Sequence, residues 1–143
     1  MIIKTTRFGE IDIDESRVIH FSEGLAGFPE DKEYIIMEHK PGSPFMWLQS
    51  LASPGLAFVI MNPFQVYPDY LKDISPDEEK AMKPGGNETV MVFGIVTVPN
   101  NRATESTINL MGPVIIDPET KEGKQVILAN SGYNHRHPLN LIK

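Results

Sequence analysis

The stretch TVMVFGIVTV at residues 89–98 is the strongest strand signal in the chain, because it is almost continuous in β-branched and aromatic residues. A run of this kind is typical of a strand that is buried on both faces. Gly94 interrupts the run, and a glycine inside a strand indicates a bulge or a close approach by another part of the backbone. The stretch therefore predicts a central strand with an irregularity at Gly94.

Short segments surround this strand, and the 11 glycines and 12 prolines of the chain separate them. The segments alternate in polarity or form short apolar runs, as strands do. The strands predicted before the central one cover residues 2–7, 10–13, 17–21, 33–38, 45–51 and 56–61. After it, residues 113–116 and 124–129 flank the turn-rich segment DPETKEG and are expected to form a hairpin.

One helix is clearly indicated. Ser75 can cap it, Pro76 suits its first position, and Glu78 completes a capping box. The helix is expected over residues 76–83, and Pro84-Gly85-Gly86 is expected to end it.

Many short strands with one minor helix favour a mostly β fold, an antiparallel β-barrel-like domain or a sandwich. The alternation of strands and helices that builds a nucleotide-binding sheet is missing. A further segment of one to two helical turns is weakly indicated around residues 69–72. Since 143 residues make about one domain and no repeat or linker divides them, residues 1–143 are expected to form a single domain.

The net charge of −6 is unevenly distributed. Between Glu10 and Glu38, nine acidic residues face only Arg17 and Lys32, so this segment carries −7 and the rest of the chain +1. An acidic surface repels phosphate, so direct binding of nucleic acid is not expected. The segment can be a solvated face that serves solubility, or it can attract a basic partner protein.

The absence of cysteine excludes a disulfide framework, a thiolate metal site and a cysteine nucleophile. The opening residues MIIKTTRFGEID do not resemble a signal peptide, and no apolar run approaches the ~20 residues of a membrane helix. The protein is therefore expected to be cytoplasmic and not to associate with a membrane.

Candidate catalytic groups are weak. No phosphate-binding glycine motif is present, and Ser106 and Ser131 lack the context of a serine nucleophile. Asp12 and Asp14 share a strand face as paired catalytic carboxylates would, but their surroundings read as exposed, and nothing there would raise the pKa of either group by burial. These observations predict a protein that is not an enzyme and needs no cofactor.

A metal site is also weakly supported. His135 and His137 would point the same way in an extended chain, so two ligands could converge. No third ligand is evident nearby, and a polar surface segment is the expected outcome.

Large side chains are concentrated in the predicted strand at residues 45–51, FMWLQSL. Aromatic residues and methionine are favoured at protein interfaces. Trp47 shares a strand face with Phe45, opposite Leu48, so one face belongs to the core and the other could be partly exposed. The sequence leaves open which face is which. For any one of these residues core packing is the simpler explanation.

Read together, several motifs resemble the bacterial flagellar assembly factor FliW family. FSEGLAGF at residues 21–28 resembles its F-x-x-G-L-x-G-F opening, and PFMWLQSL at residues 44–51 resembles its P-F-x-W-L-Q-S-L strand. The remaining matches, in the same order as in the family, are AFV at 57–59, Pro63, PDY at 68–70, NL at 109–110, PV at 113–114 and Tyr133. One departure is Ala26, where the family often has proline.

The resemblance implies a compact, non-catalytic β-barrel-like protein, expected to be monomeric when free. Such proteins bind newly made flagellin and, alternatively, the RNA-binding regulator CsrA. The free factor prevents CsrA from repressing translation of flagellin mRNA, and accumulating flagellin takes the factor away again.

Partner contacts follow as expectations. The acidic segment, including Asp12, Asp14 and Glu15, is expected to face basic CsrA. Phe45 and Leu48, if exposed, are candidates for apolar contact with flagellin, and Trp47 and Tyr70 are further candidates for partner contact. The alternative reading is a barrel that binds a small ligand, which requires a cavity of several hundred Å³ at its mouth.

Overall fold

The computed structural model describes residues 1–83 and 89–139. It is mostly β, as predicted, and its strands are β1 (Ile2–Thr5), β2 (Gly9–Asp12), β3 (Ile19–Phe21), β4 (Glu33–Glu38), β5 (Phe45–Ser50), β6 (Ala57–Met61), β7 (Met91–Thr97), β8 (Thr107–Ile108), β9 (Val114–Ile116), β10 (Glu122–Gln125) and β11 (His137–Pro138). The short strands β8 and β11 were not predicted, because two residues carry no detectable periodicity.

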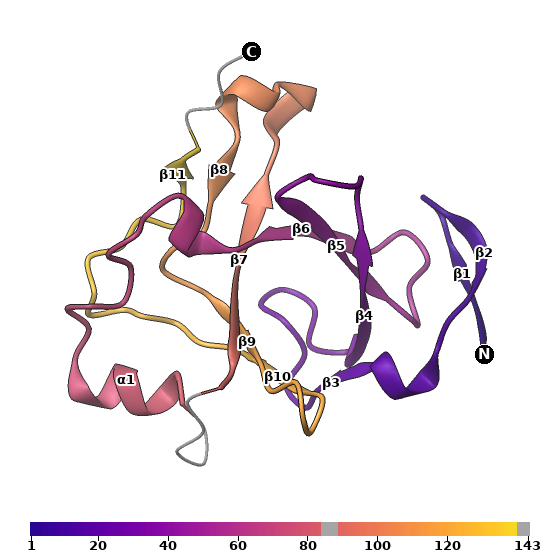
Figure 1. Ribbon diagram of the computed structural model, residues 1–143, viewed down its shortest axis with the longest axis horizontal. Coiled ribbons are helices and arrows are strands. Elements are labelled where there is room, and N and C mark those ends of the chain that lie inside the picture. Colours follow the sequence, from indigo (N-terminus) through magenta and orange to yellow (C-terminus); the bar gives the residue numbers. More distant parts are fainter. Residues whose placement is uncertain (84–88, 140–143) are drawn as a thin grey trace.

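Seven strands close into a barrel (Figure 1). The order around it is β7-β6-β5-β4-β3-β10-β9, and β9 pairs with β7 to complete the circle. Every neighbouring pair is antiparallel except β3 and β10, which run parallel. The prediction of an antiparallel β-barrel-like fold is thereby confirmed, with one parallel contact that the sequence did not indicate.

The strand β7 is the predicted central strand, and the irregularity expected at Gly94 lies beside it. Val96 is paired with Ile108 of β8, whereas Phe93 is paired with Val114 of β9. Three steps along β7 therefore correspond to six steps along its partner, so that the partner bulges away opposite Gly94. The closest group is a side chain and not a backbone: a Cβ on Gly94 would lie 2.4 Å from Ile108 Cδ1.

Side chains fill the inside of the barrel. Alternate residues of the strands point inward, and Tyr34, Leu48 and Ile60 are completely buried there. The rings of Phe21 and Tyr34 meet edge to face, 5.4 Å apart. Burial raises the pKa of Tyr34 to about 12, so its hydroxyl is neutral at physiological pH, and that hydroxyl has no hydrogen-bond partner among the described residues.

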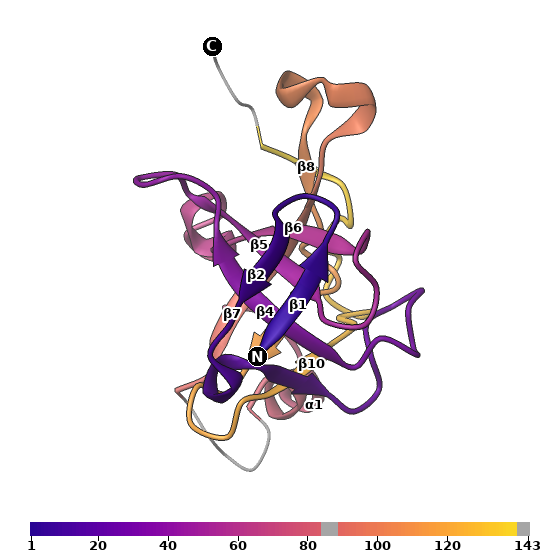
Figure 2. The same ribbon diagram turned by 90° about the vertical axis from the view of Figure 1, so that its right-hand side faces the viewer.

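Two apolar layers cover the outside. Figure 2 shows the β1–β2 hairpin lying across the barrel in front of β4, where Ile3 and Ile13 pack on Ile35. On another side, the segment that leads into the helix packs on the outer face of β7 and on the last hairpin, and Tyr70 donates a hydrogen bond to the Leu110 carbonyl at 2.5 Å. These layers leave the protein with three linked cores, one inside the barrel and two outside.

The predicted capping box is present at the helix α1 (Pro76–Ala81). Ser75 Oγ accepts from the Glu78 N–H at 3.2 Å, and the Glu78 carboxylate accepts in return from the Ser75 N–H. The helix ends two residues before the predicted boundary, and the expected stop at residues 84–86 lies outside the described residues. The helical segment expected at residues 69–72 was wrong, since those residues form turns.

The last hairpin is confirmed, but its second strand, β10, begins at Glu122 and ends at Gln125, whereas it was expected at residues 124–129. The backbone contact nevertheless continues beyond the strand, because the N–H groups of Val126 and Leu128 donate to the carbonyls of Pro113 and Met111. Gly24 and Gly27, within the FSEGLAGF segment, have positive φ angles of 65° and 87°.

The contact at Gly94 predicts the cost of an added methyl group. Gly94→Ala should lower the free energy of unfolding by about 1–3 kcal/mol, because the fully buried Ile108 must move to make room. Urea unfolding measures the change. Gly55→Ala is the matched control, since its new Cβ would meet only Thr6 Oγ1 at 3.6 Å. An equal effect at both glycines would contradict the packing argument.

Two buried tyrosines should respond differently to loss of the hydroxyl. Tyr70→Phe leaves the Leu110 carbonyl without its partner and should cost about 1–3 kcal/mol in the free energy of unfolding. Tyr34→Phe removes a hydroxyl for which the described residues supply no partner, and it should change stability by less than about 1 kcal/mol. Chemical denaturation of both variants under one condition makes the comparison, and a larger loss for Tyr34→Phe would refute it.

Candidate protein-binding surface

The acidic residues between Glu10 and Glu38 come from β2, from the 3₁₀ turn Glu15–Arg17, from the loop after β3 and from β4. The strands β2 and β4 and that turn lie on the same side of the barrel, on the right in Figure 1. All of these acidic side chains are exposed except Asp31, which is half-buried. The first part of the chain therefore presents an acidic, solvent-facing surface beside the β1–β2 hairpin.

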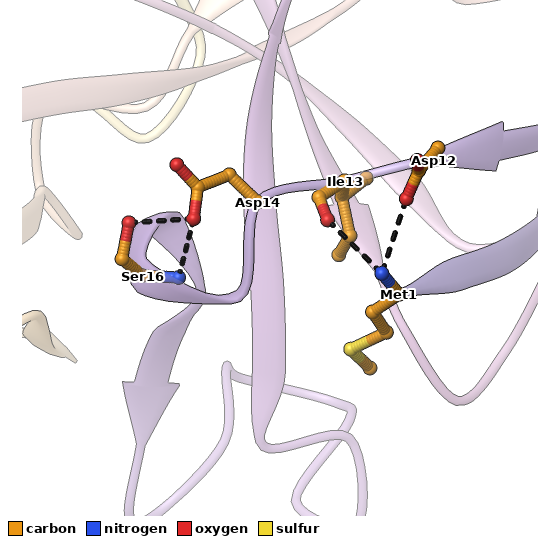
Figure 3. A network of polar contacts seen from close by, with 5 residues as sticks. All are labelled: Met1, Asp12, Ile13, Asp14 and Ser16. Carbon is orange, nitrogen blue, oxygen red and sulfur yellow. Dashed lines mark hydrogen bonds and ion pairs between the residues drawn. The ribbon is translucent and has the colours of Figure 1, made fainter.

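Asp12 and Asp14 do not form a pair (Figure 3). Asp12 Oδ1 lies 3.0 Å from the amino group of Met1, with which it forms an exposed ion pair. Asp14 Oδ1 instead accepts from the hydroxyl of Ser16 at 2.7 Å and from its N–H at 2.9 Å, which caps the 3₁₀ turn. Each carboxylate is thus held by its own local partner.

Two hydrogen bonds from Ser16 lower the pKa of Asp14 below its ordinary value. The bond from the Ser16 side chain contributes most, and the bond from its backbone N–H comes second. A catalytic acid would need the opposite shift. Asp14 is therefore a permanently charged cap at neutral pH, and the arrangement supplies no general acid.

Glu15 is exposed, and within the described chain no hydrogen bond or ion pair involves its side chain. Of the three acidic residues proposed for partner contact, it is the one whose charge is uncommitted. Its place in the 3₁₀ turn is set by the Asp14 cap, so the local structure presents the Glu15 charge to solvent.

Asp31 has a structural role that the sequence did not reveal. Asp31 Oδ2 accepts a hydrogen bond from Ser50 Oγ at 2.6 Å. This bond lowers the pKa of Asp31 most, and a hydrogen bond from the Ser53 side chain lowers it further. The contact joins the acidic loop to the end of β5, 19 residues further along the chain. The carboxylate of Asp31 therefore anchors the acidic loop to β5.

The strand β5 resolves which of its faces is core. Met46 and Leu48 point into the barrel, whereas Phe45, Trp47 and Gln49 point outward. Leu48 is completely buried, so its expected role in partner contact is corrected: it fills the barrel. Tyr70, also proposed for contact, is 2% exposed and holds the Leu110 carbonyl, so it too belongs to the core.

Trp47 stays half-buried on the outer face, among residues from distant segments. The Arg7 guanidinium lies 4.0 Å from its ring centroid in a cation–π contact. Phe8 and His39 approach the ring at centroid distances of 6.2 and 5.8 Å. Because Trp47 is the only tryptophan of the chain, its fluorescence reports on this side of the barrel.

Phe45 lines a groove of about 340 Å³ together with Met61, Val66, His137 and Leu139. Beside this groove, the exposed Tyr67 ring packs edge to face on His137 at 5.8 Å. Phe45 is therefore a predicted apolar contact residue that lies in an open concave surface. The contribution of His137 could not be foreseen, because it arises from the pairing of β11 with β8.

The two histidines considered as metal ligands lie in different surroundings. His135 is exposed, whereas His137 packs on Tyr67. Within residues 1–83 and 89–139, no group of three or more His, Asp or Glu side chains could hold a metal ion.

In the same described part of the chain, no helix is long and apolar enough to cross a membrane. Side chains fill the interior of the barrel, but a pocket of about 400 Å³ opens beside β3, β9 and β10 and is lined by Ser22, Ile115 and Gly123, among others, so the alternative reading stays a prediction.

Comparison with known proteins agrees with this architecture. The family model described as FliW protein matches residues 2–139. The flagellar assembly factor FliW of Natranaerobius thermophilus is 38% identical over 139 residues, which cover 97% of this chain and 92% of that protein. The flagellar assembly factor FliW of Magnetococcus marinus is 35% identical over 139 residues, which cover 97% of this chain and 85% of that protein.

The structure is similar as well. A crystal structure of the flagellar assembly factor FliW superposes with a TM-score of 0.83 at 33% identity and covers 100% of this chain and 99% of that one. The resemblance seen in the sequence motifs is thereby confirmed. Since the family model, the relatives and the solved structure all span nearly the whole chain, the protein belongs to the FliW family of flagellar assembly factors.

Proposed function

We propose that this protein binds flagellin in the cytoplasm and, alternatively, the RNA-binding regulator CsrA, so that the free factor relieves repression of flagellin mRNA. The observation that carries the proposal is the match to the FliW family over residues 2–139. A role in assembling flagella requires protein partners, and the motifs that resemble the family run through the whole chain in order.

The charge distribution supports a basic partner. A protein that holds RNA presents positive charge, and the exposed acids of β2, the Glu15–Arg17 turn and β4 present the complementary sign. Such charges at the rim of an interface act mainly on the rate of association and on its dependence on salt. The same charges disfavour phosphate, so the factor itself does not compete for the RNA.

An apolar contact suits flagellin better. Polypeptide segments that remain partly disordered before assembly bind through an amphipathic face that enters a groove. The groove at Phe45 and the half-buried ring of Trp47 are the outward-facing parts of β5 that can meet such a segment. The acidic surface and the apolar groove then contribute to contacts of different character, and alternation requires that the two bound partners exclude each other.

Titration of flagellin into the preformed complex with CsrA tests the partner exchange. Release of CsrA, followed by light scattering or size-exclusion chromatography, is the expected result, because one partner must displace the other for feedback to operate. A titration with an unrelated protein of similar size and charge is the control for nonspecific displacement. A stable complex of all three proteins would contradict alternation and leave the two surfaces independent.

Charge reversal tests the acidic surface. Glu15→Lys combined with Glu33→Lys should slow association with CsrA by roughly three- to tenfold at low salt, because both side chains are exposed. The difference should shrink at high salt, as measured by surface plasmon resonance. Asp12 and Asp14 stay unchanged in this variant because their carboxylates hold Met1 and Ser16.

The matched control is Asp73→Lys, an exposed reversal in the segment before α1, away from the β1–β2 hairpin. It changes the net charge without touching the acidic surface. If it slows association, per reversed charge, as much as the change at Glu15 and Glu33 does, only net charge matters and the proposed orientation of CsrA is refuted.

A further inference from the structure

One end of the barrel opens into a pocket of about 180 Å³ that plays no part in the proposed function. Its apolar wall is made by Ile19, Ile36 and Ile116, which belong to the packed interior of the barrel or lie against it. Arg17 and Lys121 line the same pocket. An apolar wall and two cations thus meet in one small concavity.

In the described part of the chain, the two cations form no ion pair. Among the described residues, neither Arg17 nor Lys121 lies within 4 Å of a carboxylate. Lys121 Nζ donates to the carbonyl oxygen of Pro118, which carries no net charge. The charge of Arg17 contributes to lowering the pKa of Asp14, but the Asp14 carboxylate is hydrogen-bonded to Ser16 and forms no ion pair with Arg17. Two unpaired cations in a protein of net charge −6 indicate a site for an anion.

The backbone of Lys121 adds a second observation. Its φ angle is +61°, a left-handed conformation that favours glycine and costs other residues about 1–2 kcal/mol. The hydrogen bonds from its N–H to Asp117 and from His20 to its carbonyl hold it there. Glycine would suit this turn better, so the lysine side chain is kept at a cost in stability. Strain of this kind is often found at functional sites.

We propose that this end of the barrel binds a small amphipathic carboxylate, with its short hydrocarbon chain against the three isoleucines and its carboxylate between Arg17 and Lys121. Arginine and lysine both bind carboxylates by charge-assisted hydrogen bonds. A pocket of about 180 Å³ is smaller than the roughly 300–1,000 Å³ of sites for drug-sized ligands, which suits a short chain of about four to six carbons. This site is separate from the groove at Phe45 and does not depend on the proposed partners.

Titration of the protein with hexanoate, followed by ¹H–¹⁵N NMR, tests the proposal. Saturable shifts at Ile19, Ile36, Ile116 and Lys121 are expected. Hexan-1-ol supplies the chain without the charge, and sulfate supplies an anion without the chain, so each should bind at least about tenfold more weakly than hexanoate. Equal binding of hexan-1-ol, shifts that lie elsewhere, or no saturation with hexanoate would overturn the proposal.

Variants distinguish a loss of hexanoate binding from a loss of the folded structure. Lys121→Gly removes the cation while matching the left-handed backbone, so the barrel should stay folded and hexanoate should bind about tenfold more weakly. Arg17→Gln should weaken binding to a similar degree. Lys32→Gln, the other basic residue of the acidic segment, is the matched control and should leave the affinity unchanged. Unchanged affinity in both site variants, or an equal loss in the control, would refute the site.

Discussion

Closure of the barrel depends on β7, because this strand forms backbone hydrogen bonds with three other strands. Its one edge pairs with β6, and its other edge pairs with β8 and then with β9. A single straight partner could not do this, so the segment between β8 and β9 bulges away from β7 opposite Gly94. The missing side chain at Gly94 leaves the space that Ile108 fills from β8. The rest of the architecture follows from this one junction, since β9 carries the chain on to β10 and β3 and so completes the circle.

A closed and filled barrel places function on the outside and at the ends. Tyr34, Leu48 and Ile60 occupy the interior, so partner proteins must be met by outward-facing strand residues and by the connections. The β1–β2 hairpin covers part of the outer face and brings Arg7 over Trp47, which limits how much of the tryptophan a partner could reach. The segment before α1 covers another part and is held by Tyr70. The acidic surface, the groove at Phe45 and the small cationic pocket at the barrel end are among the parts that remain open.

The electrostatic features are ordered by local geometry. Asp14 caps a turn, Asp12 meets the amino group of Met1, and Asp31 binds Ser50, so three of the acids serve the structure first. Glu15 and the other exposed acids carry the charge that solvent or a partner would sense. The count of charges in the sequence is therefore larger than the charge available for recognition. Arg17 lies in the same acidic segment, but together with Lys121 it lines a pocket that carries positive charge.

The sequence by itself determined the mostly β fold, most strand positions, the capping box of α1 and the family, because these depend on local alternation, on turn residues and on ordered motifs. It also located the acidic segment. Only the tertiary structure decided which face of β5 is core, and it placed Leu48 and Tyr70 inside. It alone set the parallel contact of β3 with β10 and brought Arg17 to Lys121, 104 residues away along the chain. The physical reason is that closure pairs strands distant in sequence, and no local pattern encodes which distant side chains then share a face or a pocket.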